Sequence, residues 1–212
     1  MKRYLCDGIV KGATHQRNGL PCQDSKKIVE ISDDIVIIAV ADGHGSEKCP
    51  RSDRGSTIAV NTFCEVMKNY LQSYGSDENG LSNLITFLNR EGDMRFAQDI
   101  CEEWQARIKQ SYYKNKEEGM LDDDGNIKWS SVFSLYGTTL LGMLITNTFV
   151  FSFQIGDGDI NLVMKDGAVT TGTTDAEGAV VVKAEDWVST EAGFKLRKSA
   201  QTQDAANTDG ED

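Results

Sequence analysis

Ile35-Val36-Ile37-Ile38-Ala39-Val40-Ala41 runs without a break into Asp42-Gly43-His44-Gly45-Ser46, and this stretch decides the fold. Its first seven residues are apolar, mostly β-branched and without polar alternation, which predicts a strand covered on both faces. Just before it, Ile28-Val29-Glu30-Ile31 predicts a partner strand, with Ser32-Asp33-Asp34 as the turn between the two. The strand ends on a carboxylate and an imidazole, so chemistry is expected at this end of the sheet.

The segments that follow predict helices and then strands again. Residues 52–73 carry apolar side chains at three- and four-residue steps, and a second helical pattern over 81–108 is interrupted near Glu91-Gly92-Asp93. Residues 138–146 and 149–155 predict a β-hairpin, and residues 160–164 begin another strand. Strands, then helices, then strands predict an α+β fold of mainly antiparallel sheets rather than a doubly wound parallel sheet.

Length and charge limit the classes of protein that this chain can belong to. The 212 residues suit one domain with a sizeable core, and no apolar run is long enough to span a bilayer. The net charge of −11 argues against nucleic-acid binding, which needs a basic face. The first residues do not resemble an export signal, so we expect a cytoplasmic protein with five reduced cysteines and no membrane partner.

Composition changes near residue 166. We therefore expect a folded domain over residues 1–165 and a divergent tail over 166–212, which is rich in Ala, Thr, Gly and Asp. The tail holds ten acidic and four basic residues, and its end after Leu196 is expected to be loosely ordered.

Three acidic loop segments lie next to predicted strands: Gln23-Asp24, Asp42-Gly43-His44 and Asp157-Gly158-Asp159. Carboxylates that converge repel one another unless a cation neutralises them, and hard oxygen ligands favour Mg²⁺ or Mn²⁺ over zinc. A histidine beside them can transfer a proton near neutral pH. Each segment alone is weak evidence, because Asp-Gly is a common turn pair.

Together, four segments resemble the ordered motifs of the metal-dependent serine/threonine protein phosphatases, the type 2C family. Residues 12–18 running into Cys22-Gln23-Asp24-Ser25 resemble its first motif, and the apolar strand ending in Asp-Gly-His-Gly resembles its most specific one. Tyr136-Gly137-Thr138-Thr139-Leu140 matches its Gly-Thr-Thr strand start, and Gly156-Asp157-Gly158-Asp159 takes the place of its Gly-Asp-Ser motif. The resemblance covers the N-terminal two-thirds of the chain.

The resemblance implies a four-layer α-β-β-α sandwich, incomplete here at its C-terminus, with two Mg²⁺ or Mn²⁺ ions in a cleft between the sheets. By position, Asp42 would bridge both ions, the Gly43 carbonyl would face one, and Asp24 would be a nearby carboxylate. Asp157 would lie where the family binds a third, weaker ion. A metal-activated water would attack the phosphorus of phosphoserine or phosphothreonine. His44 would protonate the leaving oxygen, and Arg17 would hold the phosphoryl oxygens.

Two departures from the family pattern leave alternatives open. Gln23 stands where many members have a Glu, and the family's later metal carboxylates have no clear counterpart, since Thr208-Asp209-Gly210 follows no strand. The leading expectation is a phosphatase acting on a phosphorylated protein. The alternative is a pseudophosphatase, a binding module that holds a kinase or a phosphoprotein. A third interpretation is a different phosphate hydrolase on an unrelated α+β fold. It would require the four ordered motif matches to be coincidence.

Overall fold

The structure, a computed structural model, describes residues 5–115, 121–158, 160–163, 169–171 and 178–183. Its elements, in chain order, are α1 (Ala13–Arg17), β1 (Asp24–Ser32), β2 (Ile35–Asp42), α2 (Ser52–Tyr74), α3 (Glu78–Glu91), the π-helical turn η1 (Gly92–Phe96), α4 (Ala97–Lys114), α5 (Trp129–Ser134), β3 (Leu140–Ile145), β4 (Phe149–Ile155), β5 (Asn161–Val163), β6 (Val169–Thr171) and β7 (Gly178–Lys183).

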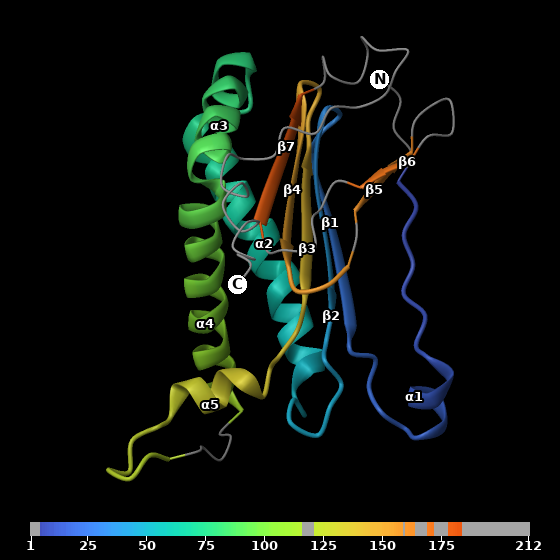
Figure 1. Cartoon of the computed structure of the whole chain (residues 1–212), viewed down its shortest axis with the longest axis vertical. Coiled ribbons are helices and arrows are strands. Elements are labelled where there is room, and N and C mark those ends of the chain that lie inside the picture. Colours follow the sequence, from blue (N-terminus) through green and yellow to red (C-terminus); the bar gives the residue numbers. More distant parts are fainter. Residues whose placement is uncertain (1–4, 116–120, 159, 164–168, 172–177, 184–212) are drawn as a thin grey trace, which may run out of the picture.

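One antiparallel sheet of five strands forms the centre of the described chain. Its strand order is β1-β2-β3-β4-β7, and β5 pairs with β6 in a separate two-stranded sheet. The helices α2, α3 and α4 lie on one side of the large sheet, whereas β5, β6 and α1 lie on the other (Figure 1). The predicted α+β class with antiparallel pairing is therefore confirmed. Within the described residues, this gives one helical layer on one five-stranded sheet.

The strand predicted over residues 35–41 is confirmed, but the prediction that both of its faces are buried is only partly correct. Ile35, Ile37 and Ala39 are buried against the helices, and Val36 on the opposite face is buried as well. Val40, however, is 43% exposed. It lies on the face away from the helices near the end of the strand, where the sheet borders a pocket rather than a second packed layer.

Aromatic side chains fill the space between the sheet and the helices. Phe63 of α2 stacks on Phe153 of β4 with ring centroids 6.1 Å apart, and Phe96 meets the edges of Phe151 and Phe153 at 5.3 Å. Buried aromatic rings contribute both apolar area and specific ring geometry. This core fixes α2 and η1 against the sheet.

The predicted interruption near Gly92 is a π-helical turn rather than a break. Apolar or small residues recur every four positions from Leu84 to Ile108, and Gly92 and Phe96 of η1 are both buried within this series. In an α-helix a four-residue step drifts by about 40° around the axis. A π-turn accommodates one extra residue and reduces this drift, so α4 continues with its apolar stripe still turned toward the core.

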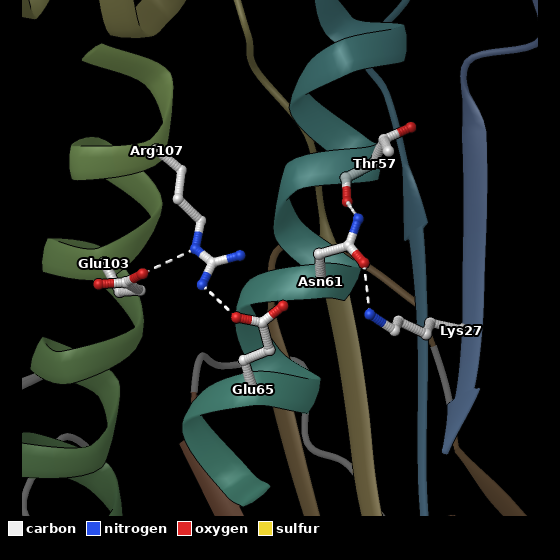
Figure 2. A network of polar contacts seen from close by, with 6 residues as sticks. All are labelled: Lys27, Thr57, Asn61, Glu65, Glu103 and Arg107. Carbon is white, nitrogen blue, oxygen red and sulfur yellow. Dashed lines mark hydrogen bonds and ion pairs between the residues drawn. The ribbon is translucent and has the colours of Figure 1, made fainter. Parts of the chain in front are cut away.

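Polar contacts join the outer surface of α2 to its neighbours. Lys27 of β1 donates to Asn61 at 2.5 Å, and Arg107 of α4 donates to Glu65 at 2.6 Å and to Glu103 at 2.7 Å (Figure 2). Glu65 is half-exposed, so the pair is expected to contribute under about 1 kcal/mol to stability. The network aligns α2 between β1 and α4.

None of the five cysteines, all of which lie in the described residues, takes part in a disulfide. That their thiols are reduced in the cell stays a prediction. None of the helices in the described ranges is long and apolar enough to cross a membrane. Most of the predicted tail lies outside the described residues. Its described part contributes β6 and β7, and β7 forms the edge strand next to β4.

Candidate active site

The antiparallel order brings three predicted carboxylates to one end of the sheet. Asp24 begins β1 and Asp42 ends β2, and the two are paired in the strand register, so their side chains lie on the same face. β2 and β4 run in the same direction because β3 is antiparallel to both, so the loop after β4, with Asp157, reaches the same end. All three carboxylates line one pocket of about 390 Å³.

The charges in this pocket act on one another. The pKa of Asp42 is raised, first by partial desolvation, then by a hydrogen bond with Asp24 and by the negative charges of Asp24 and Asp157. The positive charge that His44 can carry acts in the opposite direction. The pocket therefore concentrates like charge, and this arrangement favours a neutralising cation.

Backbone contacts from the start of β3 fix the position of Asp42. The Asp42 N–H donates to Thr139 Oγ1 at 3.0 Å, and the Thr139 N–H donates to the Asp42 carbonyl at 2.8 Å. Thr138 Oγ1 donates to the same carbonyl at 2.9 Å. The Gly-Thr-Thr segment was singled out by its resemblance alone, and its role as a clamp on the Asp42 backbone became evident only in the structure.

Gly43 is required by the close approach of two backbone segments. Its N–H donates to the Gln23 carbonyl at 3.1 Å. A Cβ at this position would lie 2.7 Å from the Ser52 carbonyl oxygen and 2.8 Å from the Gln23 carbonyl oxygen. Only a residue without a side chain allows the two loops to meet here, and this contact sets Asp24 beside Asp42.

His44 lies beside the pocket rather than among the residues that line it. Its backbone N–H donates to the Gly137 carbonyl at 3.1 Å, and its Nδ1 is 3.9 Å from Cys49 Sγ. A Cβ on Gly137 would come within 2.7 Å of this Nδ1, so the missing side chain leaves room for the ring. The imidazole is exposed and close enough to influence the charge of Asp42.

The loop that carries Asp157 is braced by a residue that the sequence analysis did not identify. Gln154 is 2% exposed, and its Nε2 donates to the carbonyls of Gly156 at 2.8 Å and Gly158 at 3.0 Å. These bonds close the turn on both sides of Asp157. A Gln near the end of an otherwise apolar strand was the available signal, because a buried amide needs hydrogen-bond partners.

The N-terminal segment also forms part of the site, which the sequence analysis did not predict. Gly8, Ile9 and Val10 line the pocket together with Val40, and an ion pair between Lys26 and Asp7 tethers this segment to β1. The segment has no periodicity and no motif letters. Its place in the site depends on tertiary packing alone.

The remaining predicted residues are not brought into the pocket. Arg17 ends α1, donates to Thr14 Oγ1 at 3.5 Å and is not among the pocket-lining residues. Its helix leads through residues 18–23 into the start of β1, at the site's end of the sheet. Asp159 and Thr208-Asp209-Gly210 lie outside the described residues.

The donor set suits a hard divalent cation in kind, since it consists of carboxylates in a pocket where they repel one another. Within the ranges that the structure describes, however, no three His, Cys, Asp or Glu side chains lie close enough together to hold a metal ion. Asp24 and Asp42 are in contact as a pair. A complete coordination shell therefore needs a movement of Asp157 or ligands from elsewhere.

Comparisons with known proteins identify the family of the chain. The sequence model described as protein phosphatase 2C matches residues 11–206. A comparison with curated proteins finds no match.

Among solved structures, the phosphatase domain of the cell fate determinant SpoIIE from Bacillus subtilis, with a fragment of its regulatory domain, is similar at 11% identity and a TM-score of 0.38, covering 74% of this chain and 33% of that one. The SpoIIE phosphatase domain in a crystal form without domain swapping is similar at 14% identity and a TM-score of 0.32. The match covers 78% of this chain and 55% of that one. Serine-threonine phosphatase 2C from Toxoplasma gondii is similar at 14% identity and a TM-score of 0.40. The match covers 73% of this chain and 46% of that one. The chain thus spans between a third and just over half of the length of these proteins.

Proposed function

The chain belongs to the protein phosphatase 2C family, and we propose that it is a metal-dependent phosphatase that hydrolyses phosphoserine and phosphothreonine in proteins. One observation carries this proposal, namely that Asp24, Asp42 and Asp157, which lie far apart in the sequence, line the same pocket. A structural role alone gives no reason to concentrate three carboxylates in one place, because their repulsion costs stability.

The proposed roles of the carboxylates follow from their positions. Bound Mg²⁺ or Mn²⁺, two ions and a weaker third, would neutralise phosphate charge and activate the attacking water. Asp42, whose backbone is held by Thr138 and Thr139, would be the main carboxylate that holds the first two ions, and the Gly43 carbonyl would be a further oxygen ligand. Asp24 would orient this assembly through its contact with Asp42, and Asp157 would serve the third ion.

Two further residues are proposed to act on the phosphate ester. His44 is exposed beside the pocket, and we assign it the proton that the leaving seryl or threonyl oxygen needs. Arg17 is assigned to the phosphoryl oxygens, where a guanidinium can bind two oxygens at once. Arg17 is exposed and makes one long contact with Thr14 within the described part, so little holds its side chain away from a substrate.

The proposed partner is a phosphorylated cytoplasmic protein, and a kinase that generates such a substrate is a further candidate. Lys26 and the apolar residues Ile9, Val10 and Val40 are among the other residues that line the pocket. A peptide side chain next to the phosphorylated residue would meet this apolar surface.

The proposal is tested by phosphate release from a phosphothreonine peptide with and without Mn²⁺. Hydrolysis should depend on Mn²⁺ and should be abolished in Asp42→Asn, whereas Asp34→Asn, at the opposite end of β2, should behave as wild type. His44→Gln should lower kcat by about 10²–10⁴-fold, the usual range for loss of a general acid, and His15→Gln serves as its control. Mn²⁺-dependent turnover that is unchanged in Asp42→Asn would refute the assignment.

A calorimetric titration separates the alternatives. Two-ion binding with turnover supports the phosphatase. A chain that binds phosphoprotein but neither binds divalent ions nor turns over would instead be the pseudophosphatase that the Gln23 substitution suggests.

A further inference from the structure

A second pocket lies at the far end of α2 from the candidate active site. It is lined by the C-terminal residues of α2 and by side chains of α3 and η1, and its volume is about 580 Å³. The active-site pocket lies near the start of α2, and a helix of 23 residues is about 33 Å long. The two pockets are therefore separate sites on the same molecule.

The π-turn places two arginines in this pocket. Arg90 is in the last turn of α3 and Arg95 is in η1, and both line the pocket. In a regular α-helix, residues five apart point about 140° away from each other. The extra residue in the π-turn brings the fifth residue close to where the fourth would be, so the two side chains share one face.

Neither arginine is held in place by a polar bond to another described residue, although Arg95 lies close enough to Tyr70 for its charge to act on that hydroxyl. Among the described residues, Arg90 and Arg95 make no hydrogen bond or ion pair, and both are exposed. Because η1 and α4 continue the helix beyond Arg90, no helix end lies there whose dipole the arginines would complement. Both side chains line the same pocket.

The other lining residues supply neutral polar groups and an apolar floor. Thr86 and Asn83 offer a hydroxyl and an amide. Tyr74 and Phe87 lie ring against ring at 5.7 Å and provide an aromatic surface. Glu91 also lines the pocket, so the described lining residues carry one net positive charge, whereas the whole chain carries −11.

We propose that this pocket is a docking site for a phosphorylated segment of a partner protein, with Arg90 and Arg95 binding the phosphate and Tyr74 and Phe87 contacting an apolar side chain next to it. Guanidinium groups bind phosphate oxygens in pairs, and a phosphoryl group offers three such oxygens and close to two charges. The choice of a phosphorylated protein rests on the proposed function. Binding of the anion by the arginines does not depend on it.

The test measures fluorescence anisotropy of a labelled peptide that carries a non-hydrolysable phosphonate analogue of phosphoserine followed by leucine. Arg90→Gln and Arg95→Gln should each weaken binding about tenfold or more, as expected for the loss of a charge-assisted hydrogen bond. Glu91→Gln should tighten peptide binding, because it removes the carboxylate that opposes the phosphonate among the described lining residues. Lys114→Gln removes an exposed positive charge at the other end of α4 and should leave the affinity within about twofold.

The same series in the Asp42→Asn background separates this proposal from the catalytic one. If the arginine variants lose the same factor of peptide affinity with Asp42 and with Asn at position 42, the binding belongs to the arginine pocket. This holds even if the wild-type chain hydrolyses no phosphopeptide. Arginine variants that bind as tightly as wild type would refute the docking site. Equal binding of a peptide with glutamate in place of the phosphonate would refute the assignment to phosphate.

Discussion

Gly43→Ala is the substitution that most directly tests how the fold creates the candidate site. The added Cβ would lie 2.7 Å from the Ser52 carbonyl oxygen and 2.8 Å from the Gln23 carbonyl oxygen, whereas ordinary contact begins at 3.4 Å. The two chain segments would therefore have to separate by about 0.6–0.7 Å each. Both obstacles are backbone atoms, so no side-chain rotation can relieve the overlap.

Forced overpacking of this kind costs about 1–3 kcal/mol. For a chain of this size, each kcal/mol lowers the midpoint of thermal unfolding by about 2–4 °C. The displaced residues are neighbours of Asp24 and Asp42, so the substitution should also weaken Mn²⁺ binding if the proposed metal site is correct. Differential scanning calorimetry measures the first effect, and isothermal titration with Mn²⁺ measures the second.

Gly12→Ala is the matched control. Its Cβ would have no heavy atom within 4 Å, and Gly12 has a φ of −58°, which alanine adopts readily. This variant should unfold within about 1–2 °C of wild type, since surface substitutions usually change stability by less than about 0.5 kcal/mol. If Gly43→Ala were as stable as Gly12→Ala, the close approach of the two loops at Gly43 would be wrong.

Two further predictions concern the helical layer. Phe96→Ala should destabilise the fold by about 3–5 kcal/mol in urea unfolding, because its fully buried ring contacts four other aromatic rings. Met94→Ala, exposed in the same π-turn, should change the free energy of unfolding little. A loss below about 1 kcal/mol for Phe96→Ala would contradict the packing. The hydrogen bond and the positive charge of Arg107 lower the pKa of Glu65 in the folded protein. The stabilisation that Glu65 contributes is therefore complete at a pH above its pKa in the unfolded chain. It is lost as the pH falls through its lower pKa in the folded protein. Glu65→Gln should therefore lower the free energy of unfolding by up to about 1 kcal/mol at pH 7 and leave it unchanged near pH 2. A loss of stability that is independent of pH would mean that packing rather than charge is responsible.

The elements with a strong local pattern could be predicted from the sequence. The β-branched run at residues 35–41 forms β2, and the apolar stripe over 52–73 forms α2 almost to the residue. At Gly92 the pattern located an irregularity but not its kind. The apolar series continues on both sides of it, so the helix resumes through a π-turn instead of ending.

The candidate site was predictable in part. Strand ends and antiparallel order determine where Asp24, Asp42 and Asp157 lie, and the structure places them in one pocket. Gln154 and the Gly8–Val10 segment could not be found in the same way, because their contribution depends on which distant residues they meet. The catalytic roles of His44 and Arg17 remain predictions.

The bonds between Asp42 and Thr139 join residues 97 positions apart, and the entire helical layer lies between them. Bringing the ends of so long a segment together costs roughly 3 kcal/mol more loop-closure entropy than closing the short turn between β1 and β2. Chains with many such distant pairings fold slowly. The β2–β3 junction should therefore be among the last parts of the molecule to acquire protection from amide exchange during refolding, well after the β1–β2 hairpin.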